Sequence, residues 1–305
     1  MLSMATVLAN ETMGAPEEGL RRLVLRGIGA ARPGQFLHIQ VSAHLEPLLR
    51  RPLSIARIDK ERAEVTLFYR VQGRGTQVLA GVRPGEALSV LGPLGQGFSL
   101  PAQLSQRLQL SHQSHSPNLG HQGHTRQQGE VRQDSVQAGG ELWLVAGGIG
   151  VFPLFALAQE AVGQGITVRL FWGGTHKRFL ESAGFSYWEA LGIPLHLTTL
   201  DGSFGRQGMV TDELNTQLSL RASSSLPPVL EVATCGPRGM MQAVVERCLP
   251  LDIPVEVSLE ERMGCGVGAC LGCSVTVRSD NKSLRNKKVC QDGPVFRGEE
   301  VVWNA

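Results

Sequence analysis

Four of the six cysteines of this 305-residue chain fall within one short segment near its C-terminal end. Cys265, Cys270, Cys273 and Cys290 are separated by four, two and sixteen residues. The spacing C-x4-C-x2-C, followed by a distant fourth cysteine, is the plant-type pattern of [2Fe–2S] ligands. The glycines of MGCGVGACLGC permit the unusual dihedrals that a loop around a cluster needs. We therefore predict that these four thiols bind a [2Fe–2S] cluster.

Two other interpretations of the cysteines remain open at this point. Structural zinc also uses four cysteines, but its usual pattern is two C-x2-C pairs. Free buried cysteines are the simplest alternative. We expect Cys235 and Cys248 to be free, because they lie outside the glycine-rich loop that holds the other four. Clustered cysteines in a chain without an evident export signal favour a metal site in a reducing cytoplasm over a disulfide framework.

Composition excludes several classes of protein. Hydrophobic residues make up 42% and charged residues 18% of the chain, as expected for a globular protein. The net charge of +2 gives no electrostatic reason to expect nucleic acid or an acidic membrane surface as a partner. The apolar run 142–158 is shorter than the roughly 20 residues of a membrane span and contains glycines and a proline. We predict no membrane segment and a cytoplasmic location.

The N-terminal part, residues 1–100, is predicted to form an antiparallel β-barrel. Residues 65–71 alternate between apolar and more polar side chains, and RLVLRG and FLHIQV are typical of further short strands. Residues 101–140 hold nine Gln, five Ser and four His but no aromatic residue. Such a segment buries little apolar surface, so we predict a disordered insertion that separates two domains.

The rest of the chain is predicted to be α/β, with a small module at its end. Residues 141–250 alternate apparent strands and helices, including helices near 152–163 and over 179–191. This alternation predicts a parallel sheet with helices on both faces. Residues 251–305 are predicted to form a small [2Fe–2S] subdomain with short strands around the cysteine loop.

Two segments of the predicted barrel carry residue types that suit a dinucleotide flavin. RPLSIA covers 51–56 and YRVQGRGT covers 69–76. Arg51 and the backbone N–H groups at Gly75 and Thr76 are suited to a pyrophosphate, and Ser54 offers a hydroxyl to a flavin ring edge. Each piece alone is weak, since Gly73-Arg74-Gly75 also fits an ordinary hairpin turn.

The same chain also contains LGPLGQGF, VAGGIGVFPL and ATCGPRGMM. Taken in this order, the segments resemble the motifs of the ferredoxin–NADP reductase superfamily. The resemblance implies an FAD-binding barrel followed by a domain that binds a nicotinamide dinucleotide. It also implies a Cys-Gly-Pro turn near the flavin and nicotinamide rings. The cofactor-binding residues that follow are Arg51, Pro52, Leu53, Ser54, Phe68, Tyr69, Arg70, Gly75, Thr76, Gly147, Gly148, Gly150, Cys235 and Gly236.

Within this superfamily the chain looks most like the electron-transfer subunits of type B dihydroorotate dehydrogenase. The features that carry this resemblance are Leu53 in RPLS, the cysteine loop and VCQDGPVF. This family implies FAD, one [2Fe–2S] cluster, and transfer of electrons to NAD from a separate catalytic subunit. The expected partner is an FMN-containing TIM barrel in a heterotetramer of two subunits of each kind. Val295 and Phe296 are expected as apolar contacts with it. The insertion at 101–140 departs from the family pattern.

Two other functions remain as alternatives. One is a related FAD and [2Fe–2S] subunit of an NADPH-linked ferredoxin oxidoreductase or sulfhydrogenase. The other is a redox sensor without turnover, which the intact flavin and nucleotide motifs disfavour.

Overall fold

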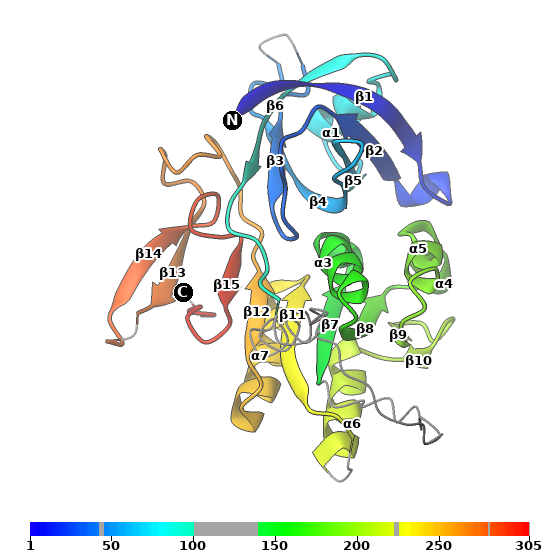
Figure 1. Cartoon of the computed structure of the whole chain (residues 1–305), viewed down its shortest axis with the longest axis vertical. Coiled ribbons are helices and arrows are strands. Elements are labelled where there is room, and N and C mark those ends of the chain that lie inside the picture. The colour runs from blue at the N-terminus through cyan, green and yellow to red at the C-terminus, as the bar shows by residue number, and fades with distance from the viewer. Residues whose placement is uncertain (43–45, 101–139, 223–225, 280, 305) are drawn as a thin grey trace, which may run out of the picture.

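The computed structural model describes residues 1–42, 46–100, 140–222, 226–279 and 281–304. A β-barrel lies above an α/β domain in Figure 1, and a small hairpin projects beside both. The insertion predicted over 101–140 lies outside the described residues, except for Gly140.

The predicted antiparallel barrel is confirmed. Its closed strand order is β1-β2-β5-β4-β3-β6, with β6 pairing back to β1. Alternation along β5 sends Val65, Leu67 and Tyr69 into the barrel core, as a two-residue period requires. The first strand, β1, was not predicted from the sequence. The bounds are β1 Leu2–Thr12, β2 Leu20–Arg26, β3 Phe36–Ile39, β4 Arg51–Asp59, β5 Glu64–Arg70 and β6 Ala87–Leu94, with helix α1 Arg74–Ala80 between β5 and β6.

The predicted parallel sheet is also confirmed. The strand order is β10-β9-β8-β7-β11-β12-β15, and every pairing is parallel except that of β15 with β12. From β7 the chain adds strands on one side of the sheet as far as β10, and it then returns to add β11 and β12 on the other side of β7. Open α/β sheets bind ligands at such a change in strand order, here between β7 and β11. The bounds are β7 Glu141–Gly147, β8 Thr167–Gly174, β9 Leu195–Thr199, β10 Arg206–Gln207, β11 Val229–Cys235, β12 Val255–Ser258 and β15 Val295–Arg297.

Helices cover both faces of this sheet because successive strand residues point to opposite sides. Leu142, Leu144 and Ala146 of β7 pack with α3, α4 and α5, whereas Trp143 and Val145 pack with α6 and α7. The bounds are α3 Val151–Gly163, α4 Lys177–Ser182, α5 Phe185–Glu189, α6 Val210–Ala222 and α7 Arg238–Cys248.

The single helix expected over 179–191 is wrong in detail. The structure has two short helices, α4 and α5, on either side of Gly184. Gly184 has φ +91°, a left-handed conformation that ends one helix and that L side chains rarely adopt. Helix α6 was not predicted at all, and its sequence carries only a weak apolar stripe.

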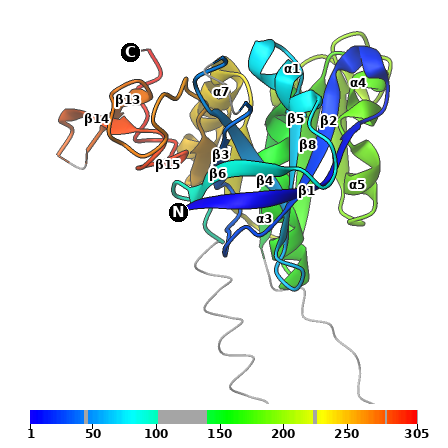
Figure 2. The same ribbon diagram turned by 90° about the horizontal axis from the view of Figure 1, so that it is seen from above.

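The C-terminal segment is divided between two structures. Strands β13 Ser274–Arg278 and β14 Leu284–Lys288 form the projecting hairpin beside the cysteine loop (Figure 2). The flanking strands β12 and β15 belong to the large sheet. Val275, Val277, Cys273 and Cys290 share the core on the α6–α7 side of the sheet. The cysteine loop is therefore held by the α/β domain itself.

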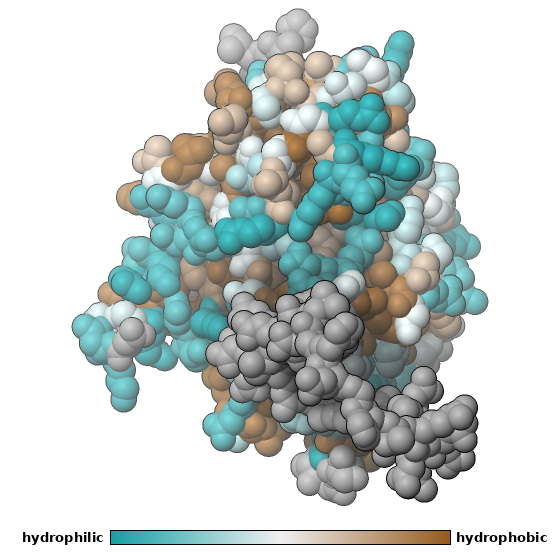
Figure 3. Space-filling view, viewed as in Figure 1, coloured by the Kyte–Doolittle hydropathy of each residue, from teal (hydrophilic) through white to brown (hydrophobic). Residues whose placement is uncertain are grey.

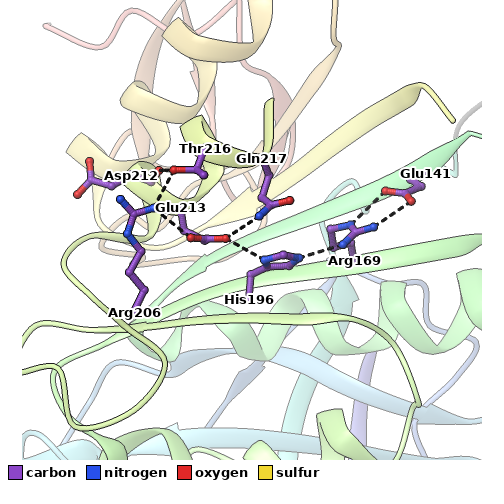
Figure 4. A network of polar contacts seen from close by, with 8 residues as sticks. All are labelled: Glu141, Arg169, His196, Arg206, Asp212, Glu213, Thr216 and Gln217. Atoms are coloured by element: carbon purple, nitrogen blue, oxygen red, sulfur yellow. Dashed lines mark hydrogen bonds and ion pairs between the residues drawn. The ribbon is translucent and has the colours of Figure 1, made fainter. Parts of the chain in front are cut away.

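A chain of charged side chains joins the amino ends of three strands and α6 (Figure 4). The carboxylate of Glu141 accepts hydrogen bonds from Trp143 Nε1 at 2.6 Å and from Arg169 Nε and Nη2 at 3.2 Å. Arg169 Nη1 lies 3.0 Å from His196 Nε2, and His196 Nδ1 lies 2.9 Å from Glu213. Glu141 is the first residue of β7 and so lies at the end of that strand opposite the glycine turn.

Within the described part of the chain, no helix has the length and apolar character that crossing a membrane requires. On the face drawn in Figure 3, the hydrophobic residues that are not covered by grey atoms form separate patches among hydrophilic ones.

Candidate cofactor sites

One cavity of about 250 Å³ lies between the barrel, the α/β domain and the cysteine segment. Six of the residues predicted to bind FAD line it together: Pro52, Leu53, Ser54, Phe68, Tyr69 and Arg70. The α/β domain contributes Ile149, Phe152 and Pro153, and the segment leading to the cysteines contributes Leu259 and Met263. The structure thus brings RPLS and the end of β5 to one site, although they are separate in the sequence.

The residues of β5 divide between two environments. Tyr69 is buried, and its hydroxyl donates to Asn10 Oδ1 at 2.9 Å inside the barrel. Phe68 instead packs on Phe152 of α3, with ring centroids 5.1 Å apart. Tyr69 therefore holds the barrel together, while Phe68 joins the barrel to the α/β domain and forms part of the cavity wall.

Arg51, Gly75 and Thr76 form a second group at the start of α1. A Cβ on Gly75 would lie 2.2 Å from Arg51 Nε, so the guanidinium rests directly on the glycine backbone. Thr76 Oγ1 accepts from the backbone N–H groups of Gln72 and Gly73 at 3.0 and 3.2 Å, which fixes the turn. This segment begins a helix, so the hairpin alternative for Gly73-Arg74-Gly75 is wrong. The arrangement places the guanidinium of Arg51 beside the first turn of α1.

The glycine turn lines a second cavity, of about 430 Å³, at the carboxyl ends of β7 and β11. Gly147, Gly148, Gly150 and Gly236 all border it, and Arg70 borders both this cavity and the first. A Cβ on Gly150 would lie 2.3 Å from the carbonyl oxygen of Cys235, so the two strand ends approach backbone to backbone. An apolar cavity of about 650 Å³ continues from the turn toward α4 and α6. Together the two cavities can accept an elongated ligand.

The thiol of Cys235 does not share this position. The residue is 1% exposed and is absent from the linings of the three cavities described above. Burial raises the pKa of the thiol above its ordinary value. The backbone of Cys235 therefore contacts the glycine turn at the second cavity, while its sulfur is buried in the core and does not line that cavity.

The four cysteines predicted as cluster ligands lie in one loop and its neighbouring turn. Cys273 and Cys290 are buried, and Cys265 and Cys270 are partly exposed. The N–H groups of Cys270 and Val267 point at Cys265 Sγ, 3.3 and 3.5 Å away, and Gly268 N lies 3.1 Å from Cys290 Sγ. Donation from the backbone of Cys270 and Val267 lowers the pKa of Cys265 to about 6.

This donor set fits an iron–sulfur cluster. Thiolates are its ligands, and N–H groups directed at sulfur are the hydrogen bonds that tune it. Among the described residues, no three His, Cys, Asp or Glu side chains converge closely enough to hold one metal ion. A [2Fe–2S] cluster shares its four thiolates between two irons.

Several lining residues were not identified from the sequence. Leu259, Glu260 and Glu261 follow the carboxyl end of β12, and the two glutamates border both the first and the second cavity. The sequence shows them as part of the acidic run SLEERMG, which is typical of a solvated helix end or loop. Their place at the cavity depends on the pairing of β12 within the sheet, which the sequence does not give. Phe152 and Pro153 did carry a signal, since they follow the glycine turn directly.

The expected surface contacts at Val295 and Phe296 are wrong. Both are buried, at 7% and 4% exposure, because β15 pairs with β12 at the edge of the sheet. The exposed apolar side chains of the cysteine loop are Leu271, at 75%, and Val267, at 49%.

Comparison with solved structures establishes the fold. A structure described as an NADH-dependent reduced ferredoxin–NADP oxidoreductase aligns with a TM-score of 0.73 and 24% identity, over 99% of this chain and 91% of that one. A ferredoxin NADP+ reductase from Neisseria gonorrhoeae, solved with bound FAD and NADP, aligns with a TM-score of 0.58 and 16% identity, over 82% and 91%.

Comparison with known sequences gives the family. Residues 260–302 match the iron-sulfur cluster binding domain of dihydroorotate dehydrogenase B. The dihydroorotate dehydrogenase B (NAD(+)) electron transfer subunit of Geobacillus sp. (strain WCH70) is 41% identical over 272 residues, 88% of this chain and 86% of the relative. The subunit of the same description from Bacillus cereus (strain B4264) is 35% identical over 93% of both chains. The chain belongs to the family of dihydroorotate dehydrogenase B electron transfer subunits.

Proposed function

We propose that this chain passes electrons from a dihydroorotate-oxidising catalytic subunit to NAD, through a [2Fe–2S] cluster and FAD. The observation that carries the proposal is the first cavity, whose wall is shared by the barrel, the glycine-turn helix and the cysteine segment. A flavin held there contacts the nucleotide site on one side and the cluster segment on the other. Bound FAD would supply the exchange between single electrons and a hydride.

The residues around this cavity suit a flavin dinucleotide. Ser54 offers a hydroxyl, and Pro52, Leu53 and Phe68 offer apolar surface for a ring system. Arg51, resting on Gly75 at the start of α1, supplies the cation that a pyrophosphate requires, beside backbone N–H donors. We assign FAD to the cavity and its pyrophosphate to this group.

The glycine turn suits the nicotinamide nucleotide. Gly147, Gly148 and Gly150 have no side chains, so a ligand can approach the backbone at the carboxyl end of the sheet. Trp172 Nε1 donates to the carbonyl of Gly148 at 3.0 Å and holds the turn in place. We assign NAD to the second and third cavities, beside Gly236.

The cluster is assigned to Cys265, Cys270, Cys273 and Cys290. As a member of this family of subunits the chain has a catalytic partner, which we propose is an FMN-containing TIM barrel in a heterotetramer with two subunits of each kind. Electrons that leave the cluster for a second protein require a short path, so the cluster loop is the proposed contact. Leu271 and Val267 are its exposed apolar side chains.

The test is reconstitution from purified parts. The chain with dihydroorotate and NAD should form no NADH until the catalytic subunit is added. Leu271→Asp should weaken copurification of the two subunits, whereas Leu220→Asp, an equally apolar and 56% exposed site on α6, should not. Dihydroorotate-dependent NADH formation by this chain alone would overturn the proposal.

A further inference from the structure

The third cavity, of about 650 Å³, is bordered by two loops that follow β8 and β9. Thr175 lines it from the first loop and Leu200 from the second. The N–H group of Leu200 donates to the carbonyl of Gly174 at 3.1 Å, so the loops run side by side. In dinucleotide sites the residue at the adenosine ribose lies about 20 residues after the glycine turn. That spacing reaches the end of β8 here, so the loops adjoin the ribose of a nucleotide bound in this cavity.

A fourth cavity, of about 460 Å³, adjoins the third and differs from it in charge. Among the described residues that line the third cavity, only Arg70 is charged. The fourth cavity is formed by the next residues of the same two loops and by a one-turn helix of the barrel, Pro16–Glu18. The described residues that line it are Glu17, Glu18, His176, Lys177, Arg178, Asp201 and Ser203. A group attached to the ribose would therefore enter a charged environment.

Two basic side chains of the fourth cavity are paired with carboxylates of the barrel. Arg178 Nη1 lies 2.5 Å from Glu17 Oε1. His176 Nε2 lies 3.5 Å from Glu18 Oε1. The α/β domain thus supplies the cations of this cavity, and the flavin barrel supplies the anions that face them.

The loop after β9 adds a third carboxylate. Asp201 accepts hydrogen bonds from Ser203 Oγ at 2.6 Å and from Ser203 N at 2.9 Å, and these bonds lower the pKa of the carboxyl. Lys177 Nζ has its own carboxylate partner, Glu181 Oε1, at 3.7 Å. Among the lining residues, three carboxylates face the two permanent cations Lys177 and Arg178. The cavity therefore carries an excess of negative charge when its histidine is neutral.

The barrel segment that holds the two glutamates is packed against α4. Ala15 N donates to Ser182 Oγ at 3.0 Å, and Ser182 is 2% exposed. A Cβ on Gly14 would lie 2.4 Å from the same oxygen, and Gly14 has φ +55°, so this close approach requires glycine. Met13 is buried in the core on the α4 side of the sheet. The two carboxylates therefore belong to a packed contact between the domains.

NADP differs from NAD by a phosphate on the 2′-oxygen of the adenosine ribose, which adds about 1.5 to 2 negative charges at pH 7. Dinucleotide sites place a carboxylate near this oxygen for NAD and an arginine for NADP. We propose that the fourth cavity selects NAD against NADP. Glu17 and Glu18 engage the cations that would otherwise bind a 2′-phosphate, and Asp201 repels it. This inference rests on the nucleotide placement in the proposed function and names the residues that discriminate between the two nucleotides.

A purely structural role for the two glutamates predicts a different outcome. If Glu17 and Glu18 only hold the domains together, their replacement changes the oxidation of NADH and NADPH alike. If they neutralise Arg178 and its neighbours, their replacement frees cations for a phosphate and favours NADPH alone. Removing Arg178 as well then cancels that gain.

The experiment uses the full-length chain with FAD and cluster bound, and it follows the oxidation of NADH or NADPH by an electron-accepting dye. The readout is the ratio of kcat/KM for NADPH to that for NADH, with kcat and KM determined separately. Glu17→Gln/Glu18→Gln is compared with Glu11→Gln/Glu64→Gln. The control glutamates pair with arginines of β2, and neither lines the fourth cavity. Their side-chain exposures of 57% and 16% match the 57% and 12% of Glu17 and Glu18.

The unsubstituted chain should prefer NADH. Glu17→Gln/Glu18→Gln should raise the ratio roughly three- to tenfold through the KM for NADPH, as expected for two charge interactions near the surface. Asp201→Asn should raise it in the same way. Adding Arg178→Gln to the glutamate pair should return the ratio toward its original value, and the control pair should leave it unchanged.

An unsubstituted chain that prefers NADPH, or an unchanged ratio in Glu17→Gln/Glu18→Gln, would overturn this inference alone. An equal rise in the control pair would overturn it too, since net charge then accounts for the effect. A chain that holds FAD yet oxidises neither nucleotide would overturn the proposed function as well.

Discussion

Replacing Glu141 with glutamine should destabilise the α/β domain by about 3 kcal/mol at pH 7. Burial alone would raise the pKa of this carboxyl, but hydrogen bonds from Arg169, Arg221 and Trp143 outweigh burial and lower it to about 2. Lowering the pKa of Glu141 from its ordinary value of 4.5 to about 2 corresponds to about 3 kcal/mol of free energy in favour of the ionised carboxylate in the folded protein. The Glu141 side chain is 6% exposed, so water screens these interactions weakly.

The sign of the pH dependence follows from the lowered pKa. The stability that Glu141 contributes is complete above the unfolded value near 4.5 and is lost as the pH falls toward 2, the folded value. Glutamine does not titrate in this range. The difference in unfolding free energy between the two proteins should therefore be constant from pH 7 to about 5 and shrink below pH 4.5.

The assay is urea unfolding followed by tryptophan fluorescence, to which Trp143, bonded to Glu141, contributes. Measurements at pH 7, 5 and 3.5 cover both sides of the transition. The control is Glu189→Gln, at an exposed glutamate of α5 in the same domain. A midpoint for Glu141→Gln equal to that of the control at pH 7, or a difference that persists unchanged at pH 3.5, would refute the reasoning.

Three further predictions concern the cofactors and a second buried carboxyl. Arg51→Ala removes a charge-assisted contact worth about 1.5–3 kcal/mol, so FAD should be lost more readily on gel filtration; an unchanged FAD-to-protein ratio would make Arg51 a surface residue. Cys270→Ser should abolish the visible and EPR signals of the cluster while FAD stays bound, and a full-strength cluster would disprove the ligand assignment. Burial and then Glu256 raise the pKa of Glu231 to about 7 despite its bond to Arg297. Ionising Glu231 therefore lowers the stability of the unsubstituted chain as the pH rises from about 4.5 through 7. The stability of Glu231→Gln relative to the unsubstituted chain should increase between pH 5 and pH 8. A difference in thermal unfolding between the two proteins that is the same at both pH values would contradict this.

Features that depend on neighbouring residues were predictable from the sequence. The two-residue alternation of 65–71 predicted a barrel strand, and its inward set is Val65, Leu67 and Tyr69. The cysteine spacing predicted one loop, because four and two intervening residues leave the chain little freedom. The glycine turn and RPLS were recognisable as motifs, and the structure gathers both around adjoining cavities.

Contacts between distant segments were not predictable in this way. Val295 and Phe296 form an apolar pair in a polar stretch and suggested a docking surface, but pairing of β15 with β12 buries them. Cys235 belongs to the Cys-Gly-Pro motif, yet its side chain is buried in the core and does not line the cavities. The left-handed Gly184 divides a helix that apolar periodicity alone would continue.

From the sequence we predicted the cysteine loop, the barrel, the parallel sheet and the glycine turn, and the structure contains all four. The loop and the barrel strand follow from spacing or periodicity over a few residues, the sheet follows from the alternation of strands and helices, and the glycine turn was identified by its resemblance to a known family. The folded chain was needed to see which parts share a cavity, and that His38 lies against Gly266, more than two hundred positions further along the chain. Such contacts depend on how strands from separate domains pack. No periodicity records that packing, because burial of a side chain is a property of the assembled fold.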